Sequence, residues 1–536
     1  MGPPMASLNF ITLAKLRGPG RLRIACQHPA ASLSGFMFSG LLRAAAPFVL
    51  LLLSTAAAAQ TAPPVAPADL MRHIRMLASD EFQGRAPGTE GERRTIDYIA
   101  EQFRARGLEP AGENGNWFQA MRMVERTPVA HNARWVANGR DLPFEATEIL
   151  LVGRDAGERI ADAPVIFAGH GVRMPDRGID QLAGTDVTGA VVLILLEGPD
   201  VPGFPSLADR ARTLNEAGAA AVIAVVGADA PWDTVRQMLA RGTTRLDIPM
   251  ARITGALPIA VAQRLIGAAG GNFDRLLNDQ PGSSFRAVTL PIRASLEATT
   301  TVQRYATNNV VGRLRGSGAT HESLLILAHW DHFGTCRPEG EADRICNGAV
   351  DNASGVAALI EVAGRLGQGA RPVRDVLFLA TTSEEVGLIG AGYFAAHPVV
   401  PLPSIVAAIN LDTVAIHPAG TPVAILGGNP EVNAVIQAAV EASGRRLDTD
   451  GEADSFINRQ DGFALAQAGV PAVMFGGSFS DMALLNAFLG SRYHQPDDQV
   501  DGIVLDGAAE DTTLTAAVAR RLADPSVYRR TPPPTP

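Results

Sequence analysis

Short apolar runs alternate with apolar stripes at helical spacing from about residue 307 to the C-terminus. The runs that predict strands lie at 309–313, 323–328, 375–380, 405–410, 423–426 and 472–475. Several are apolar on both faces, as expected for parallel strands that helices cover on both sides. Helices are predicted between them, with Asn429 and Pro430 opening one and Gly444 closing it. The pattern predicts an α/β fold whose mixed, mainly parallel central sheet is flanked by helices.

The pattern of apolar and polar residues before residue 307 differs from the pattern after it. Ile96, Ile99 and Phe103 share one face of a helix predicted around 91–106, within an N-terminal part at 60–150. Residues 151–292 carry short apolar runs separated by Gly, Pro and Asp, with one obvious helix at about 207–217, which predicts a small β-rich insert. The remainder of the main domain is then 293–524, and its last helix is expected at about 507–522. The Pro-rich end, 525–536, is predicted to be a disordered tail.

The first 59 residues are typical of an export signal. Arg43 precedes sixteen uncharged residues centred on a leucine run, and three alanines end the segment before Gln60. The apolar stretch is short for a membrane span, which needs about 20 residues. We therefore expect cleavage near residue 59, no stable membrane anchor afterwards, and a periplasmic or secreted protein. Met37 is an alternative translation start, and a retained N-terminal anchor is the alternative to cleavage.

Composition narrows the classes of protein. Of 536 residues, 46% are hydrophobic and 19% are charged, which excludes a disordered or fibrous chain. The formal net charge of −9 argues against a nucleic-acid partner. Three cysteines exclude a disulfide scaffold. In an exported chain the two that follow the signal, Cys336 and Cys346, are candidates for a disulfide, with two free thiols as the alternative.

Polar residues that can hold metals follow the predicted strands. His329 and Asp331 come directly after the strand at 323–328, the Glu384–Glu385 pair follows the strand at 375–380, and Asp412 follows the strand at 405–410. Ligands of open α/β sheets collect beyond the carboxyl ends of the strands. Two further groups stand outside strands: Asp351 lies just before a helix, and His494 lies in a polar loop.

Two histidines and three carboxylates form a ligand set for a pair of divalent ions about 3.5–4 Å apart. Two Zn²⁺, three carboxylates and one bridging hydroxide add to a neutral site, which avoids burying net charge. One glutamate of the Glu384–Glu385 pair is then free to act as a general base. Each residue alone has an ordinary structural explanation, such as a helix N-cap for Asp351, so the hypothesis depends on their joint occurrence.

The motifs resemble those of the M28 family of zinc aminopeptidases. The matching segments are LASDEFQGRAPGT at 77–89, AHWDHFG at 328–334, VDNASG at 350–355, TSEEVG at 382–387, NLD at 410–412 and YH at 493–494. The resemblance implies a zinc-exopeptidase fold over nearly all of the mature chain. The insert at 151–292 is similar to a protease-associated domain, most clearly at 214–223.

The resemblance also implies a role for each residue. Asp351 would bridge two zinc ions, Glu385 and His494 would complete one site, and His329 and Asp412 would complete the other. Glu384 would be the general base, and Asp331 would orient His329. Asp498 would support His494 in the same way.

Two positions near these motifs leave questions open. Gly462, next to Asp461, lacks the polar side chain that the family often has there, so the pocket contacts that such a side chain would make are not expected here. His332 exceeds the minimal ligand set and is either a pocket residue or a structural one.

These features predict an exported aminopeptidase that carries two Zn²⁺ per chain and acts on peptides with a free N-terminus. The sequence does not fix its oligomeric state. The alternatives are a related zinc acyl-transfer enzyme, such as a glutaminyl cyclase or a carboxypeptidase, and a binding homologue without metal. A serine hydrolase is disfavoured because the chain has no Gly-x-Ser-x-Gly elbow.

Overall fold

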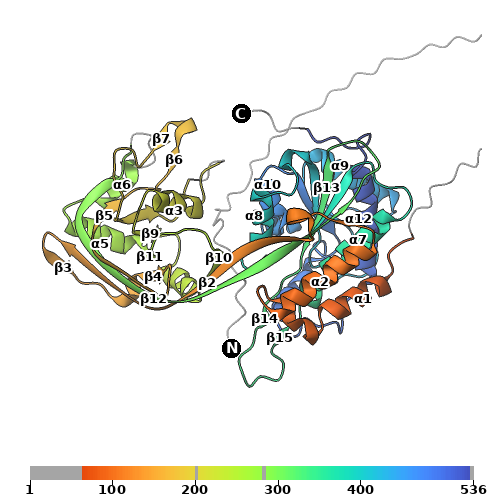
Figure 1. Ribbon diagram of the computed structural model, residues 1–536, viewed down its shortest axis with the longest axis horizontal. Helices are drawn as coiled ribbons and strands as arrows, with labels where there is room; N and C mark the ends of the chain where they lie inside the picture. The colour runs from red at the N-terminus through yellow and green to blue at the C-terminus, as the bar shows by residue number, and fades with distance from the viewer. Residues whose placement is uncertain (1–62, 200–202, 280–284, 532–536) are drawn as a thin grey trace, which may run out of the picture.

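The computed structural model describes residues 63–199, 203–279 and 285–531, which form two lobes joined by a long two-stranded ribbon (Figure 1). The predicted export signal lies outside these residues. The ribbon consists of β2 (Phe118–Ala137) and β12 (Val288–Leu314), which pair antiparallel from Phe118–Val310 to Ala137–Ile292. Both strands run from one lobe into the other, so a single backbone ladder connects the two cores.

A mixed sheet forms the centre of the larger lobe. Its strand order is β18-β19-β17-β13-β16-β12. The four inner strands are parallel and the two outer strands are antiparallel. Besides β12, the strands are β13 (Ser323–His329), β16 (Asp375–Thr381), β17 (Ile405–Asn410), β18 (Ala424–Gly427) and β19 (Ala472–Gly476). The predicted fold class and all six predicted strands are confirmed.

Helices cover both faces of this sheet, and alternate residues of β13 show the division. Leu324 and Ile326 face a core shared with α1 (Pro67–Leu77), α2 (Glu90–Ala105), α7 (Gly355–Gly367), α9 (Pro430–Ala442) and α12 (Asp506–Leu522). Leu325 and Leu327 face the opposite core, with α8 (Ile389–Ala396) and α10 (Gly462–Gln467). The predicted N-cap of α9 is confirmed, because Asn429 accepts a hydrogen bond from the Val432 amide.

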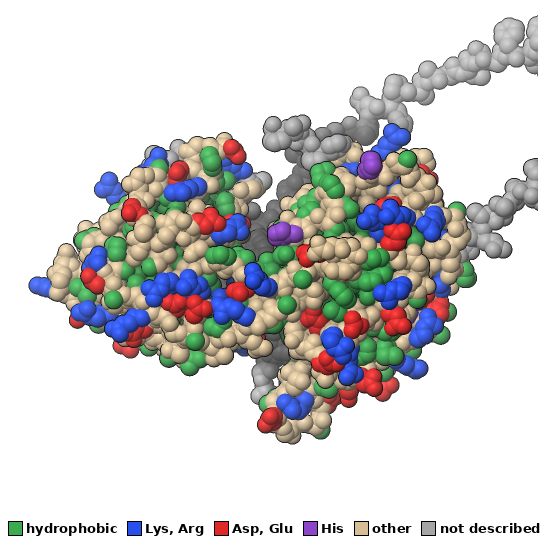
Figure 2. Space-filling model, in the orientation of Figure 1, with side chains coloured by type: hydrophobic (Ala, Val, Ile, Leu, Met, Phe, Trp, Pro, Cys, Tyr) green, Lys and Arg blue, Asp and Glu red, His purple; other side chains and the backbone are tan. Residues whose placement is uncertain are grey.

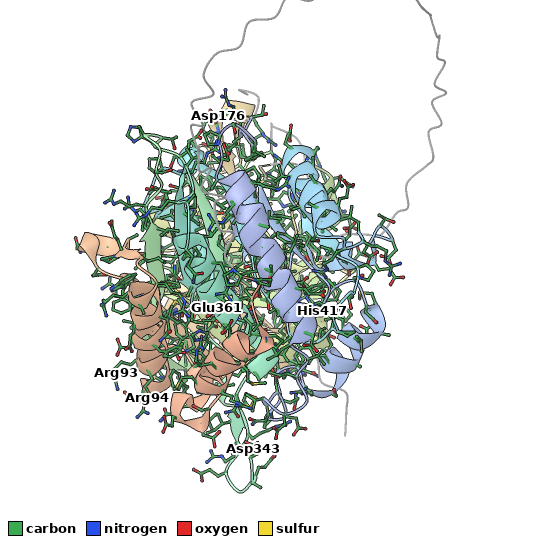
Figure 3. All side chains as sticks on the ribbon, turned by 90° about the vertical axis from the view of Figure 1, so that its right-hand side faces the viewer. Arg93, Arg94, Asp176, Asp343, Glu361 and His417 are labelled. Atoms are coloured by element: carbon green, nitrogen blue, oxygen red, sulfur yellow. A yellow bond between two sulfur atoms is a disulfide. The ribbon has the colours of Figure 1, made fainter. Side chains whose placement is uncertain are left out.

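Two buried polar contacts hold these helices in place. Glu361 of α7 accepts from Arg106 after α2 at 2.7 Å and lies 3.1 Å from Nε2 of His73 on α1. His417 lies 2.9 Å from Asp511 of α12. Figure 3 labels Glu361 and His417 on the side of the lobe where these helices pack.

The smaller lobe has its own sheet and core. The strands that join the ribbon are β5 (Gly157–Phe167), β8 (Val191–Leu195), β9 (Ala221–Val226), β11 (Ile253–Pro258) and β4 (Leu150–Gly153). The predicted helix is α3 (Leu207–Glu216). The prediction of a single obvious helix in this region was incomplete. Three more helices form: α4 (Trp232–Ala240), α5 (Ile259–Ala268) and α6 (Phe273–Asp279). Helix α6 has only 7 residues, and α5 begins directly after β11 and is apolar over most of its length, so neither shows a separate helical period.

The surface of this lobe carries both signs of charge, as Figure 2 shows. Arg304 of the ribbon pairs with Asp155 at 2.8 Å and with Asp247 at 3.3 Å.

Within the described residues, no helix has the length and apolarity that crossing a membrane requires.

The end of the chain differs from the prediction of a tail disordered from residue 525. Tyr528 is buried, its hydroxyl donates to the Val406 carbonyl, and its own carbonyl accepts from Arg374. Arg530 donates to the carbonyls of Leu402 and Ile405. Composition suggested disorder, but one aromatic ring and two arginines fasten this end to the sheet.

Tyr528→Ala should therefore lower the free energy of unfolding by about 3 kcal/mol, because it removes a buried ring and a hydrogen bond. The matched control is Val527→Ala, since the Val527 side chain is 51% exposed and its loss should cost less than about 0.5 kcal/mol. Chemical denaturation followed by circular dichroism measures both. Equal stabilities for the two variants would contradict the packed chain end.

Candidate metal centre

Three neighbouring parallel strands deliver polar side chains to one edge of the larger sheet. His329 is the last residue of β13, Glu384 and Glu385 follow β16, and Asp412 follows β17. Because β13 lies between β16 and β17, these residues come together at the carboxyl ends. The predicted cluster thus has a direct topological cause.

Asp351 lies at the centre of this cluster. It sits in the turn Ala349–Ser354, directly before α7. Its Oδ1 is 3.3 Å from Nε2 of His329, and its Oδ2 is 3.2 Å from Nε2 of His494. His494 arrives from the loop between α11 (Met482–Ser491) and α12. One carboxylate therefore faces both histidines.

The cluster has two halves that share Asp351. In one half, Nε2 of His329 lies 3.6 Å from Oδ1 of Asp412 and 3.9 Å from Oε2 of Glu384. In the other, Nε2 of His494 lies 3.0 Å from Oε2 of Glu385. The structure brings together all five residues that the sequence suggests as metal ligands, with Glu384 beside them.

The donor set suits divalent cations. His329, Asp351 and Asp412 offer ligand atoms within 4.8 Å of one another, and so do His332, Asp351 and Glu385. Tetrahedral zinc with bonds of about 2.0–2.2 Å places its ligand atoms roughly 3.4 Å apart. Among the described residues, Oδ2 of Asp351 and Nε2 of His494 are buried without a hydrogen-bond partner. A cation between them would satisfy both atoms.

Burial of this many carboxylates shifts their protonation. Burial raises the pKa of Glu384 well above its ordinary range, against the charge of His329. Burial would lower the pKa of His494, but the negative charges of Glu385 and Asp351 outweigh it and raise that pKa to about 10. The cluster therefore draws positive charge strongly, either as protons on the histidines or as bound cations.

Arg85 supports the centre in a way that the sequence did not reveal. Its fully buried guanidinium donates to the carbonyls of Leu77, Trp330, Asn347 and Gly348. These carbonyls belong to α1 and to the loops that carry His329 and Asp351. Arg85 stood inside a motif quoted for the family resemblance, but that motif gave no hint that its partners are backbone atoms far along the chain.

Asp498 supports a different residue from the one expected. It was predicted to assist His494, but its carboxylate accepts from the backbone amides of Val350 and Asp351 at 3.0–3.1 Å. A carboxylate suits this position because its two oxygens can accept several hydrogen bonds at once. Asp498 thus fixes the backbone from which the shared carboxylate projects.

The Asp331 carboxylate makes a contact beyond its predicted role. Its Oδ1 is 3.8 Å from Nδ1 of His329, longer than a hydrogen bond, and it accepts from the Glu384 amide at 3.1 Å. The backbone carbonyl of Asp331 is closer to His329 Nδ1, at 3.3 Å. Asp331 therefore links the β13 loop to the loop of the two glutamates, and its orientation of His329 stays a prediction.

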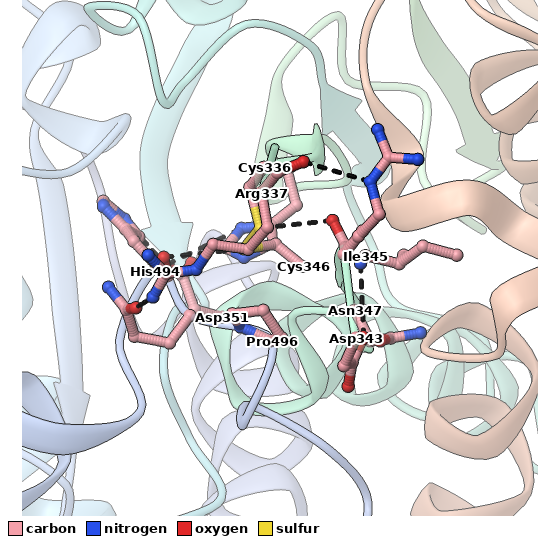
Figure 4. Close-up of a disulfide and its surroundings, with 12 residues drawn as sticks. Cys336, Arg337, Asp343, Ile345, Cys346, Asn347, Asp351, His494 and Pro496 are labelled. Atoms are coloured by element: carbon pink, nitrogen blue, oxygen red, sulfur yellow. Dashed lines mark hydrogen bonds and ion pairs between the residues drawn. A yellow bond between two sulfur atoms is a disulfide. The ribbon is translucent and has the colours of Figure 1, made fainter. Parts of the chain in front are cut away.

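Cys336 and Cys346 form a disulfide, as predicted. They close a loop whose base is the short hairpin of β14 (Gly334–Thr335) and β15 (Ile345–Cys346). Sγ of Cys346 lies 3.5 Å from the carbonyl oxygen of His494, and Arg337 donates to the side chain of Gln495. Figure 4 shows the bridge beside His494 and Asp351, so the stapled loop packs against a cluster residue.

A pocket with about 460 Å³ of open space borders the cluster. Its polar wall includes His329, Asp351, Glu384 and Asp412. The other lining residues are mostly apolar: Thr413, Phe456, Arg459, Gln460, Met474, Phe479, Leu485, Leu489 and Tyr493. Such a combination is suited to an apolar side chain whose neighbouring bond lies at the cluster.

Comparison with known proteins finds similarity to peptidases. The model of peptidase family M28 matches residues 309–519. The probable lipoprotein aminopeptidase LpqL of Mycobacterium tuberculosis is 23% identical over 471 residues, which cover 81% of this chain and 80% of that protein. The vacuolar membrane protease of Clavispora lusitaniae is 34% identical over 97 residues, which make up 18% of this chain and only 8% of that protein.

Two solved structures match most of this chain at low sequence identity. The aminopeptidase from Aneurinibacillus sp. strain AM-1 is 17% identical, with a TM-score of 0.47 over 88% of this chain and 97% of that one. A zinc aminopeptidase from Bacillus subtilis is 18% identical, with a TM-score of 0.43 over 87% and 97%.

The sheet and the cluster at its carboxyl edge lie in the part of the chain that matches this family model, residues 309–519. Through this part the chain is similar to peptidase family M28.

Asp498→Asn should weaken zinc binding about 10–100-fold, because the amide keeps one acceptor and turns a donor toward the amides of the Asp351 turn. The control is the exposed neighbour Asp497→Asn, which should bind zinc like the wild type. Competition with a chromophoric chelator measures both affinities. Wild-type zinc affinity in Asp498→Asn would show that the turn needs no such support.

Proposed function

We propose that this chain is an exported aminopeptidase that binds two zinc ions and removes N-terminal residues from peptides. The observation that carries the proposal is the position of Asp351, whose two oxygens face the two halves of one cluster. Asp351 would bridge the ions, with His329 and Asp412 in one half and Glu385 and His494 in the other. When bound, the ions would polarise the scissile carbonyl and lower the pKa of a water molecule.

Glu384 is the proposed general base. It lines the pocket, and its Oε2 is 3.9 Å from His329 Nε2, so it stands beside the ligands without being needed as one. In this position its carboxylate can take a proton from the attacking water and deliver it to the leaving amine. The backbone amides of Glu384 and Glu385, 3.1 and 3.5 Å from the Asp331 carboxylate, hold this loop in place.

The pocket supports attack on the bond after the first residue. Its apolar wall offers room for one side chain, and its polar wall is the cluster itself. A substrate side chain seated there would place its adjoining peptide bond beside Glu384 and Asp351. A related zinc acyl-transfer enzyme, such as a glutaminyl cyclase or a carboxypeptidase, is the second candidate, because the same cluster could serve it.

The finer assignments belong to the same proposal. Residues 1–59 would be the cleaved signal, and residues 151–292 would be a protease-associated domain. The disulfide supports a periplasmic or secreted location, since such bridges persist in oxidising compartments.

A substrate panel separates the candidate reactions. Amino-acid amides and peptides with a free N-terminus should be hydrolysed from that end, whereas peptides with a blocked N-terminus should be resistant. Liquid chromatography with mass spectrometry identifies the products. Release of C-terminal residues, or cyclisation of N-terminal Gln, would replace the aminopeptidase with the second candidate.

Glu384→Gln should retain zinc but lower kcat about 10²–10⁴-fold, because the amide cannot accept the proton. Asp351→Ala should lose zinc as well as activity, since it removes the oxygens shared by both halves. Metal analysis and steady-state kinetics on the same preparations test both. Near-wild-type kcat in Glu384→Gln would remove the assigned base.

A further inference from the structure

We propose that His332 is a positioning residue that fixes Glu385 and so strengthens metal binding in the His494 half of the cluster. The inference rests on the proposed function, because it takes the cluster to be a metal centre. It assigns a role to the histidine that exceeds the minimal ligand set.

The two oxygens of Glu385 are divided between two histidines. Nδ1 of His332 lies 2.6 Å from Oε1, and Nε2 of His494 lies 3.0 Å from Oε2. An ionised carboxylate only accepts hydrogen bonds, so Nδ1 of His332 is the donor. The next acidic oxygen, Oδ2 of Asp351, is 4.0 Å from this nitrogen, which is beyond a hydrogen bond. His332 therefore engages one oxygen of Glu385 and leaves the other facing His494 and Asp351.

The imidazole of His332 is held firmly enough to act in this way. Its side chain is fully buried, and its ring packs edge-on against Phe333, with centroids 5.2 Å apart. Gly348 makes room for it, because a Cβ at this glycine would lie 2.7 Å from Cδ2 of His332. The His332 backbone amide also donates to the carbonyl of Arg85. Ring, backbone and neighbouring glycine thus define one orientation.

Among the described residues, the carboxylate of Asp412 in the other half is supported by a hydroxyl rather than by a second buried histidine. Asp412 accepts from the hydroxyl of its neighbour Thr413 at 2.9 Å, and its side chain is more exposed than that of Glu385, at 12% against 4%. A buried imidazole that orients a ligating carboxylate restricts it more strongly than a hydroxyl near solvent. Partners of this kind typically change metal affinity by 10–100-fold when they are removed. The two halves should therefore differ in affinity, with the Glu385 half binding its ion more tightly.

The test compares two substitutions in the metal-free full-length mature protein. His332→Leu removes the donor and fills the space with an apolar side chain. His332→Asn keeps an N–H close to the position of Nδ1. Zinc is titrated in competition with a chromophoric chelator, and cobalt absorption spectra report the coordination of each half. His321→Leu, at an exposed histidine, is the matched control.

We expect two zinc sites in the wild type and in His321→Leu. In His332→Leu the tighter site should weaken about 10–100-fold while the weaker site is unchanged, and the cobalt spectrum of the affected half should change. His332→Asn should bind within about threefold of the wild type. Thermal melting of the metal-free proteins checks that the variants are folded.

Wild-type binding at both sites in a folded His332→Leu would overturn the role of His332. So would equal weakening in His332→Asn and His332→Leu, because the effect would then be steric. A wild-type protein that binds no zinc would instead defeat the proposed function. The two failures are therefore distinguishable within one titration series.

Discussion

Carboxylates cannot be buried side by side unless positive charge is bound among them. Asp351, Glu384 and Glu385 meet in the interior of the larger lobe, with Asp412 close by and two histidine nitrogens between them. The raised pKa values of Glu384 and His494 express this constraint, because they describe a site that collects protons when no other cation is bound. The surrounding fold is best understood as the scaffold that holds these groups together despite their repulsion.

That scaffold works mainly through the backbone. Parallel strands place His329, Glu384 and Asp412 at one edge, and Asp498 fixes the turn of Asp351 through two amides. Arg85 joins that turn to the β13 loop through carbonyl oxygens, and its own charge is favourable to the buried carboxylates. Because Arg85 and Asp498 form hydrogen bonds with backbone groups, they hold the cluster in place without occupying its ligand atoms.

The sequence predicted the strands and the cluster well for a physical reason. Apolar runs with polar residues at their ends are local patterns, and the topology of parallel strands turns them into a shared site. The partners of Arg85 and Asp498 were beyond reach, because they are backbone groups up to 263 and 148 residues away. Helix α5 was missed because it follows β11 without a break, and the packed end of the chain was missed because its composition resembles that of a tail.

Anomalous diffraction at the zinc edge, from crystals of the zinc-loaded protein, tests the central claim most directly. The account predicts two peaks about 3.5–4 Å apart, one on each side of the Asp351 carboxylate. A single peak, or peaks that do not contact Asp351, would contradict it.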